Sequence, residues 1–140
     1  MKKYSGHVVK QLFGLVLPLL ALLAVLAPPP VALAAELVMF ERQHCPFCIR
    51  WKRDIGVFYH KTDEGKRAPL RIVDMDKTRP DDLRHIKGLW VSPTFVLLDD
   101  AGREVGRLEG YQNEDSFWFL LGELLARMDK RKDNRKDDRQ

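Results

Sequence analysis

The alternation of hydrophobic and polar positions along the chain predicts four short β-strands. Glu36–Glu41 is an apolar run typical of a buried central strand, and Leu70–Asp74 alternates between apolar and polar residues. Thr94–Leu98 and Glu104–Glu109 are expected to form a hairpin, because the intervening Asp99–Gly102 favours a turn. The pattern therefore predicts four strands that form one small sheet.

Helical periodicity predicts two helices between these strands. Pro46 to about Tyr59 places its apolar residues at helical spacing and its charged residues on the other side. Pro80–Ile86 is expected to be a brief helix, because a proline and two aspartates favour a first helical turn, whereas His60–Ala68 is a polar loop. A strand, a helix and a strand in succession imply a right-handed crossover and a parallel pair, so the fold class is α/β.

A third helix is predicted to follow Asn113, which can cap its first turn. An apolar stripe from Phe117 to Met128 gives this helix one face for the core. The tail 130–140 has six basic residues, three acidic ones and no apolar residue, and is expected to be disordered or a frayed helix.

Charge is concentrated at the two ends of the chain. The 140 residues have a formal charge of +4, but three lysines precede residue 35 and the tail 130–140 has an excess of three basic residues. Residues 35–129 therefore have a formal charge of −2, which offers no basic groove to a nucleic acid. These residues are expected to form one domain that acts as a monomer.

Residues 1–34 have the organisation of a secretory signal peptide. The short basic segment Met1–Lys10 precedes sixteen residues without a polar side chain, Leu12–Ala27, and Ala32–Ala34 offers small residues at the cleavage positions. The alternative is an uncleaved membrane anchor, although a helix of that length rises only about 24 Å against a hydrocarbon core of about 30 Å. Export predicts a periplasmic protein in an oxidising compartment.

The two cysteines of the chain stand in Cys45-Pro46-Phe47-Cys48, where the first strand gives way to a helix. Cys45 would lie beside the unpaired N–H groups of the helix start and is the candidate nucleophile. Cys48, one turn further, is the candidate resolving thiol. Pro46 suits a first helical turn, and Phe47 adds apolar surface beside the sulfurs. His44 either favours the thiolate as a cationic imidazole or merely faces solvent.

The cysteine pair admits three other roles. A zinc half-site has the same spacing, but no second ligand pair exists among the histidines, which are His7, His44, His60 and His85. A structural disulfide would close so short a ring that it removes little entropy from the unfolded chain. Two inert core thiols fit poorly with the polar approach Arg42–His44. Redox exchange without a metal or organic cofactor is therefore favoured.

The order of the predicted elements, with the cysteine pair at the first strand–helix junction and Ser92-Pro93-Thr94 before the third strand, resembles the thioredoxin superfamily. The resemblance implies a minimal thioredoxin fold, in which a four-stranded mixed sheet of order 2-1-3-4 is flanked by about three helices. It also implies that Pro93 is cis and faces the disulfide, and that the backbone of Ser92 pairs with a substrate strand. The alternative is an ordinary trans proline at the start of a strand.

Two departures from the thioredoxin pattern affect the chemistry. Pro46-Phe47 stands where thioredoxins have Gly-Pro, which is closer to the glutaredoxin pattern. Met39 stands where thioredoxins place a buried acid. Cys48 therefore needs another route for its proton, for which water is the simplest candidate and Glu41 a weaker one.

A narrower likeness is to the exported, thioredoxin-like SoxS proteins of bacterial sulfur-oxidation clusters. It rests on four stretches, Glu64–Leu70, Thr94–Asp99, Arg107–Tyr111 and Phe117–Leu125. The likeness implies a periplasmic thiol–disulfide oxidoreductase that restores the thiol of a carrier protein and is recharged by a membrane electron donor. The rivals are a disulfide-donating oxidase or isomerase, and a non-catalytic adaptor that binds partners at the Pro93 edge.

The mature protein is expected to begin at Ala35, because Ala32–Ala34 provides the cleavage site. Intact-mass analysis or N-terminal sequencing of the periplasmic fraction measures this start directly. Recovery of the full-length chain in membranes would instead show that the segment is retained as an anchor.

Overall fold

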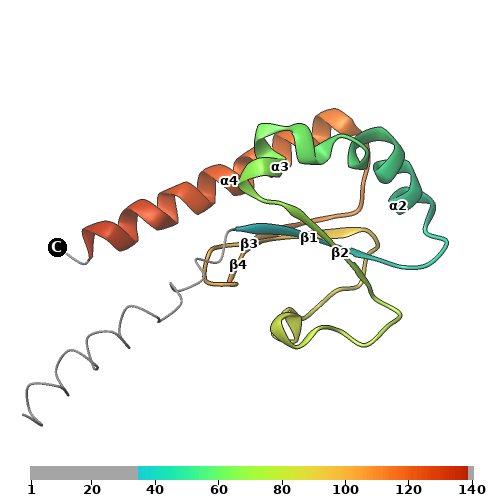
Figure 1. Cartoon of the computed structure of the whole chain (residues 1–140), viewed down its shortest axis with the longest axis horizontal. Coiled ribbons are helices and arrows are strands. Elements are labelled where there is room, and N and C mark those ends of the chain that lie inside the picture. The colour runs from blue at the N-terminus through green and yellow to red at the C-terminus, as the bar shows by residue number, and fades with distance from the viewer. Residues whose placement is uncertain (1–34, 139–140) are drawn as a thin grey trace, which may run out of the picture. The chain divides into compact units, whose positions relative to one another are not determined.

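The computed structural model describes residues 35–138 and shows a mixed four-stranded sheet in them (Figure 1). The predicted signal peptide lies outside the described residues. The strands are β1 (Glu36–Glu41), β2 (Leu70–Asp74), β3 (Thr94–Leu98) and β4 (Glu104–Glu109). Their bounds confirm the four strands predicted from the hydrophobic pattern.

β1 occupies the interior of the sheet. The strand order is β2-β1-β3-β4, with β2 parallel to β1, and with β3 antiparallel to both β1 and β4. This order confirms the predicted parallel pair and the 2-1-3-4 arrangement. Phe40, near the end of β1, lies opposite Thr94 at the start of β3. The loops that follow Glu41 and precede Thr94 therefore meet at one edge of the sheet.

The chain leaves β1 and enters α2 (Pro46–Trp51), which continues as the π-helical turn η1 (Lys52–Gly56). The predicted α-helix to Tyr59 is therefore too long. In η1 the Val57 N–H donates a hydrogen bond at 3.1 Å to the carbonyl oxygen of Lys52, five residues back. Apolar spacing does not distinguish this wider turn from an α-helix.

The prediction of a loop over His60–Ala68 is wrong. The segment contains the 3-10 turn η2 (Tyr59–Lys61) and the short helix α3 (Asp63–Arg67). The Thr62 hydroxyl accepts a hydrogen bond from the Gly65 N–H at 3.0 Å, and acidic residues occupy the first turn. Capping and favourable charge at the helix start thus stabilise a helix that has no apolar stripe.

Alternate residues of β1 face two hydrophobic cores. Leu37 and Met39 belong to the core beneath α2, α3 and α4 (Glu114–Asp137), which cover one face of the sheet (Figure 1). Val38 and Phe40 belong to the core on the opposite face. All four side chains are fully buried, which explains why β1 is apolar throughout.

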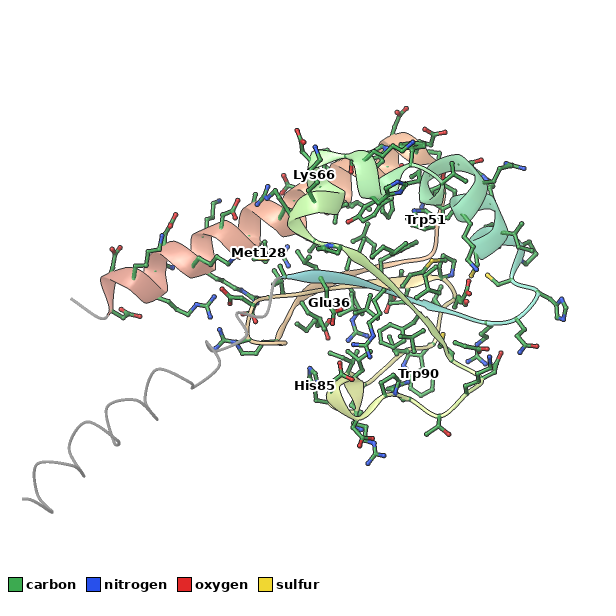
Figure 2. All side chains as sticks on the ribbon, viewed as in Figure 1. Glu36, Trp51, Lys66, His85, Trp90 and Met128 are labelled. Atoms are coloured by element: carbon green, nitrogen blue, oxygen red, sulfur yellow. The ribbon has the colours of Figure 1, made fainter. Side chains whose placement is uncertain are left out.

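The connection from β2 to β3 covers the second core. Its only regular element is the 3-10 turn η3 (Asp81–Leu83), which is shorter than the helix predicted over Pro80–Ile86. Leu83 and Ile86 are both buried, and their spacing of three residues suits a 3-10 turn. Figure 2 shows Trp90 on this side of the sheet and Trp51 on the helical side.

α4 begins at the predicted cap, since Asn113 Oδ1 accepts a hydrogen bond from the Ser116 N–H at 2.9 Å. The apolar stripe is confirmed except at Leu120, which is 47% exposed. The buried residues of α4 are Phe117, Leu121, Leu124, Leu125 and Met128. Among residues 35–138, no helix is long and apolar enough to cross a membrane.

Of the two alternatives for the tail 130–140, disorder is wrong up to Asp137, because α4 continues to that residue and the segment is helical. Arg131 donates a hydrogen bond at 3.1 Å to the backbone of β4. Arg135 lies 3.7 Å from Asp99 Oδ2 in the turn between β3 and β4. Basic side chains that meet a hairpin therefore hold the helix in place, although the tail has no apolar residue to bury.

Gly65→Ala is expected to destabilise the domain by about 1–3 kcal/mol. A Cβ at residue 65 would lie 1.9 Å from the Tyr59 carbonyl oxygen, so η2 and α3 would have to move apart. Gly122→Ala in α4 is the matched control, because nothing lies within 4 Å of its added Cβ. Helix propensity should make this control more stable by about 0.5–1 kcal/mol.

Urea unfolding of the two glycine variants measures both free energies of unfolding. A stabilising effect of Gly65→Ala would contradict the close approach of α3 to the Tyr59 backbone.

Candidate active site

Cys45 is the N-cap residue of α2. Its Sγ accepts a hydrogen bond from the Cys48 N–H at 3.2 Å, so the sulfur takes the place of an ordinary capping oxygen. Pro46 follows in the first turn, where its missing N–H has no partner to lose. His44 turns the chain into the helix with φ 58°, in the left-handed region.

The loop before β3 contacts both sulfurs. The Ser92–Pro93 peptide bond is cis, and the Cys45 thiol donates a hydrogen bond to the Ser92 carbonyl oxygen at 3.4 Å. The Ser92 hydroxyl oxygen lies 3.2 Å from Cys48 Sγ. The same oxygen accepts a hydrogen bond from the Arg42 N–H at 2.9 Å. These residues meet because β1 and β3 are adjacent and antiparallel.

The two thiols differ in burial and in acidity. Cys48 is 1% exposed, whereas Cys45 is only partly buried. Burial opposes ionisation of Cys45, but hydrogen bonds from Cys48 and from the Ser92 side chain outweigh it and lower the pKa of the Cys45 thiol. Burial first, and then the hydrogen bond with Cys45, raise the pKa of Cys48 to about 11. Cys45 is therefore the sulfur that ionises first and can attack.

The other residues predicted for the site lie around the cysteine pair. Pro46 is exposed, and Phe47 is 53% exposed, so both can meet a partner. His44 is exposed as well. The hydrogen bonds that lower the pKa of Cys45 come from Cys48, Ser92 and the Phe47 backbone. A tuning role for the His44 imidazole stays a prediction.

The Ser92 side chain belongs to the site as well as its backbone, although the family resemblance implies a role for the backbone only. Met39 is fully buried in the first core, and Glu41 forms an ion pair with Lys52 at 2.6 Å. The polar side chain in contact with the Cys48 sulfur is instead the Ser92 hydroxyl. The one signal for this contact in the sequence is a hydroxyl residue directly before a proline.

The residues around the cysteine pair decide whether it could bind a metal ion. In the part of the chain that the structure describes, no group of three or more histidine, cysteine, aspartate or glutamate side chains could hold a metal ion. The cysteine pair therefore lacks the further ligands of a closed zinc site within residues 35–138.

Two thiols at the start of a helix, beside a cis-proline loop and a β2-β1-β3-β4 sheet, define a protein of the thioredoxin fold with a Cys-x-x-Cys pair. The family model described as a thioredoxin-like domain matches residues 35–125. The chain belongs to this family. A search of curated proteins finds no match.

Several solved thioredoxin structures are similar to this chain. The reduced periplasmic thioredoxin SoxS of Paracoccus pantotrophus is 40% identical, with a TM-score of 0.59, over 66% of this chain and 97% of its own. A thioredoxin of Thermus thermophilus is 26% identical, with a TM-score of 0.50, over 72% of this chain and 86% of its own. Fasciola hepatica thioredoxin shares the fold at 24% identity and a TM-score of 0.51, over 65% of this chain and 81% of its own.

Alkylation with a small excess of iodoacetamide is expected to modify Cys45 far faster than Cys48 from neutral pH to about pH 9. The reason is that the thiolate reacts, and the pKa of Cys45 is lowered whereas that of Cys48 is raised to about 11. Fragment-ion mass spectrometry assigns the label to one cysteine or the other.

The same reaction in concentrated urea is the control, because the unfolded chain should lose the difference between the two thiols. Equal labelling of both cysteines in the folded protein would contradict the assigned acidities.

Proposed function

We propose that this protein is a periplasmic thiol–disulfide oxidoreductase that reduces a protein disulfide, or a blocked cysteine, through Cys45 and Cys48. The observation that carries the proposal is the asymmetry of the two thiols. One is accessible and has a lowered pKa, and the other is buried, has a pKa of about 11 and lies one turn away. An attacking and a resolving thiol need these different properties.

The exchange proceeds in two steps. The Cys45 thiolate attacks one sulfur of the substrate disulfide, a Cys45–substrate bond forms, and the substrate S–S bond breaks with its electron pair on the released sulfur. Cys48 then loses its proton to water and attacks Cys45 Sγ, which closes the Cys45–Cys48 disulfide and releases the second substrate thiolate. The substrate gains two electrons and the protein loses them, and no organic cofactor takes part.

The surroundings of Cys45 suit an extended protein substrate. The backbone of Ser92 adjoins Cys45 Sγ and offers a short strand edge for pairing. Phe47 and Val91 flank the site and are 53% and 40% exposed, so they add apolar contact area. The Ser92 backbone thus serves substrate binding and Phe47 supports it, whereas Pro93 is buried behind Ser92 and takes part only through the shape of the loop.

A sulfur-carrier protein is the proposed substrate. The support is the 40% identity to a periplasmic thioredoxin named SoxS, together with the signal-peptide organisation of residues 1–34. A membrane electron-transfer protein would return the Cys45–Cys48 disulfide to the dithiol after each turnover.

Cys48→Ser is expected to accumulate a mixed disulfide with the natural partner, because attack by Cys45 can proceed but resolution cannot. Cys45→Ser is the matched control and should trap nothing. Both are recovered from the periplasm after rapid acid quenching, which protonates thiolates and stops exchange, and the trapped partner is identified by mass spectrometry.

A trapped sulfur-carrier protein would support the proposed substrate, whereas a spread of newly exported proteins would identify an oxidase or isomerase. Trapping by Cys45→Ser alone would reverse the roles of the two sulfurs. No trapping by either variant would favour a non-catalytic adaptor.

A further inference from the structure

The Ser92 hydroxyl lies between the Arg42 N–H, which can only donate a hydrogen bond, and the Cys48 sulfur, which can ionise. The Arg42 N–H donates to Ser92 Oγ at 2.9 Å, and a backbone amide cannot accept in return. On its other side Oγ lies 3.2 Å from Cys48 Sγ, where either atom can be the donor. Once Cys48 is a thiolate, only the hydroxyl can donate. The contact can therefore persist when Cys48 ionises, with the hydroxyl as its donor.

The hydroxyl is held in this position by the sheet. Arg42 follows the last residue of β1, and Ser92 stands two residues before β3, its antiparallel neighbour. Thr94 Oγ1, in the same loop, donates to the Val91 carbonyl oxygen at 2.7 Å and contacts neither sulfur. Rotation of the Ser92 side chain away from Cys48 would also leave the Arg42 amide without this partner.

One other donor lies near Cys48, since a hydrogen bond from the Arg42 backbone also lowers the pKa of the Cys48 thiol, by less than the bond with Ser92. Cys45 is the titratable neighbour that acts on it, and its hydrogen bond and charge both raise the pKa of Cys48. Lys52, one turn along the helical segment, is committed to Glu41 at 2.6 Å. The hydrogen bond from Ser92 acts in the opposite sense and lowers the pKa of Cys48.

We propose that the Ser92 hydroxyl is a catalytic group of the resolving step, in which it donates a hydrogen bond to the Cys48 thiolate during attack on the mixed disulfide. The proton of Cys48 passes to water, the Cys48–Cys45 bond forms, and the Cys45–substrate bond breaks with its electron pair on the departing sulfur. This role rests on the proposed function and is separate from the pairing of the Ser92 backbone with substrate.

Three variants isolate the hydroxyl from the shape of the loop. Ser92→Val and Ser92→Thr have side chains of nearly the same shape, and only threonine keeps the hydroxyl. Thr94→Val is the matched control, because it removes a hydroxyl of the same loop that bonds to Val91 and not to a cysteine. Thermal unfolding followed by circular dichroism confirms that each variant is folded before it is tested.

Stopped-flow reaction of the reduced protein with dithiobis(nitrobenzoate) separates the two steps. Attack by Cys45 releases one coloured thiolate, and resolution by Cys48 releases the second. Ser92→Val is expected to slow the second release about tenfold at neutral pH, because the hydrogen bond to the Cys48 thiolate is lost. The pH at which the rate of this release reaches half its maximum should rise by about one unit. Ser92→Thr should restore the second release, and Thr94→Val should leave it unchanged.

Equal second phases in Ser92→Val and Ser92→Thr would overturn the inference. A second phase slowed no more than the first in Ser92→Val would also overturn it, because the Ser92 side chain lowers the pKa of Cys45 too and some slowing of the first phase is expected. The proposed function is tested separately by Cys48→Ser, which must lack the second phase. If Cys48→Ser keeps that phase, resolution by Cys48 is wrong and the proposed function fails with it. If Cys48→Ser lacks the second phase and Ser92→Val has no effect on it, the role of the hydroxyl is wrong but the proposed function is unaffected.

Discussion

The hydrogen bond from the Arg42 N–H to the Ser92 hydroxyl joins the two loops on which the site depends. It links the end of β1 to the approach to β3 across 50 residues of sequence, and it holds the serine oxygen 3.2 Å from the Cys48 sulfur. The carbonyl oxygen of the same residue accepts from Cys45 at 3.4 Å. One residue thus touches both sulfurs, so any shift of this loop changes the surroundings of the whole redox pair.

The difference between the thiols follows from their places on the helix. Cys45 caps α2 and lies partly exposed, whereas Cys48 points into the core that contains Trp51 and Phe95. The ring centroids of these two aromatic residues are 4.9 Å apart, and Cys48 in the same core is 1% exposed. Burial then raises the pKa of Cys48 while hydrogen bonds lower that of Cys45. The fold therefore sets the order in which the two thiols ionise.

Much of the fold was predictable from the sequence. The strands matched because β1 and β3 are short apolar runs, β2 alternates between apolar and polar residues, and Asp99–Gly102 marks the turn before β4. The cap of α4 matched because Asn113 precedes a long apolar stripe. The failures have a common cause. The helix over Asp63–Arg67 depends on a local cap, and the tail to Asp137 on charge pairs with a hairpin, and neither contact has a hydrophobic period.

The sequence by itself determined the chemistry that is available: two cysteines at a strand–helix junction and a Ser-Pro pair before the third strand. Only the tertiary structure decided how they act on one another. Cys48 and Ser92 are 44 residues apart, and their contact exists because β1 and β3 run antiparallel side by side. Local patterns fix helices, strands and spacing, but the pKa of a buried thiol depends on burial and on partners that the folded sheet brings together.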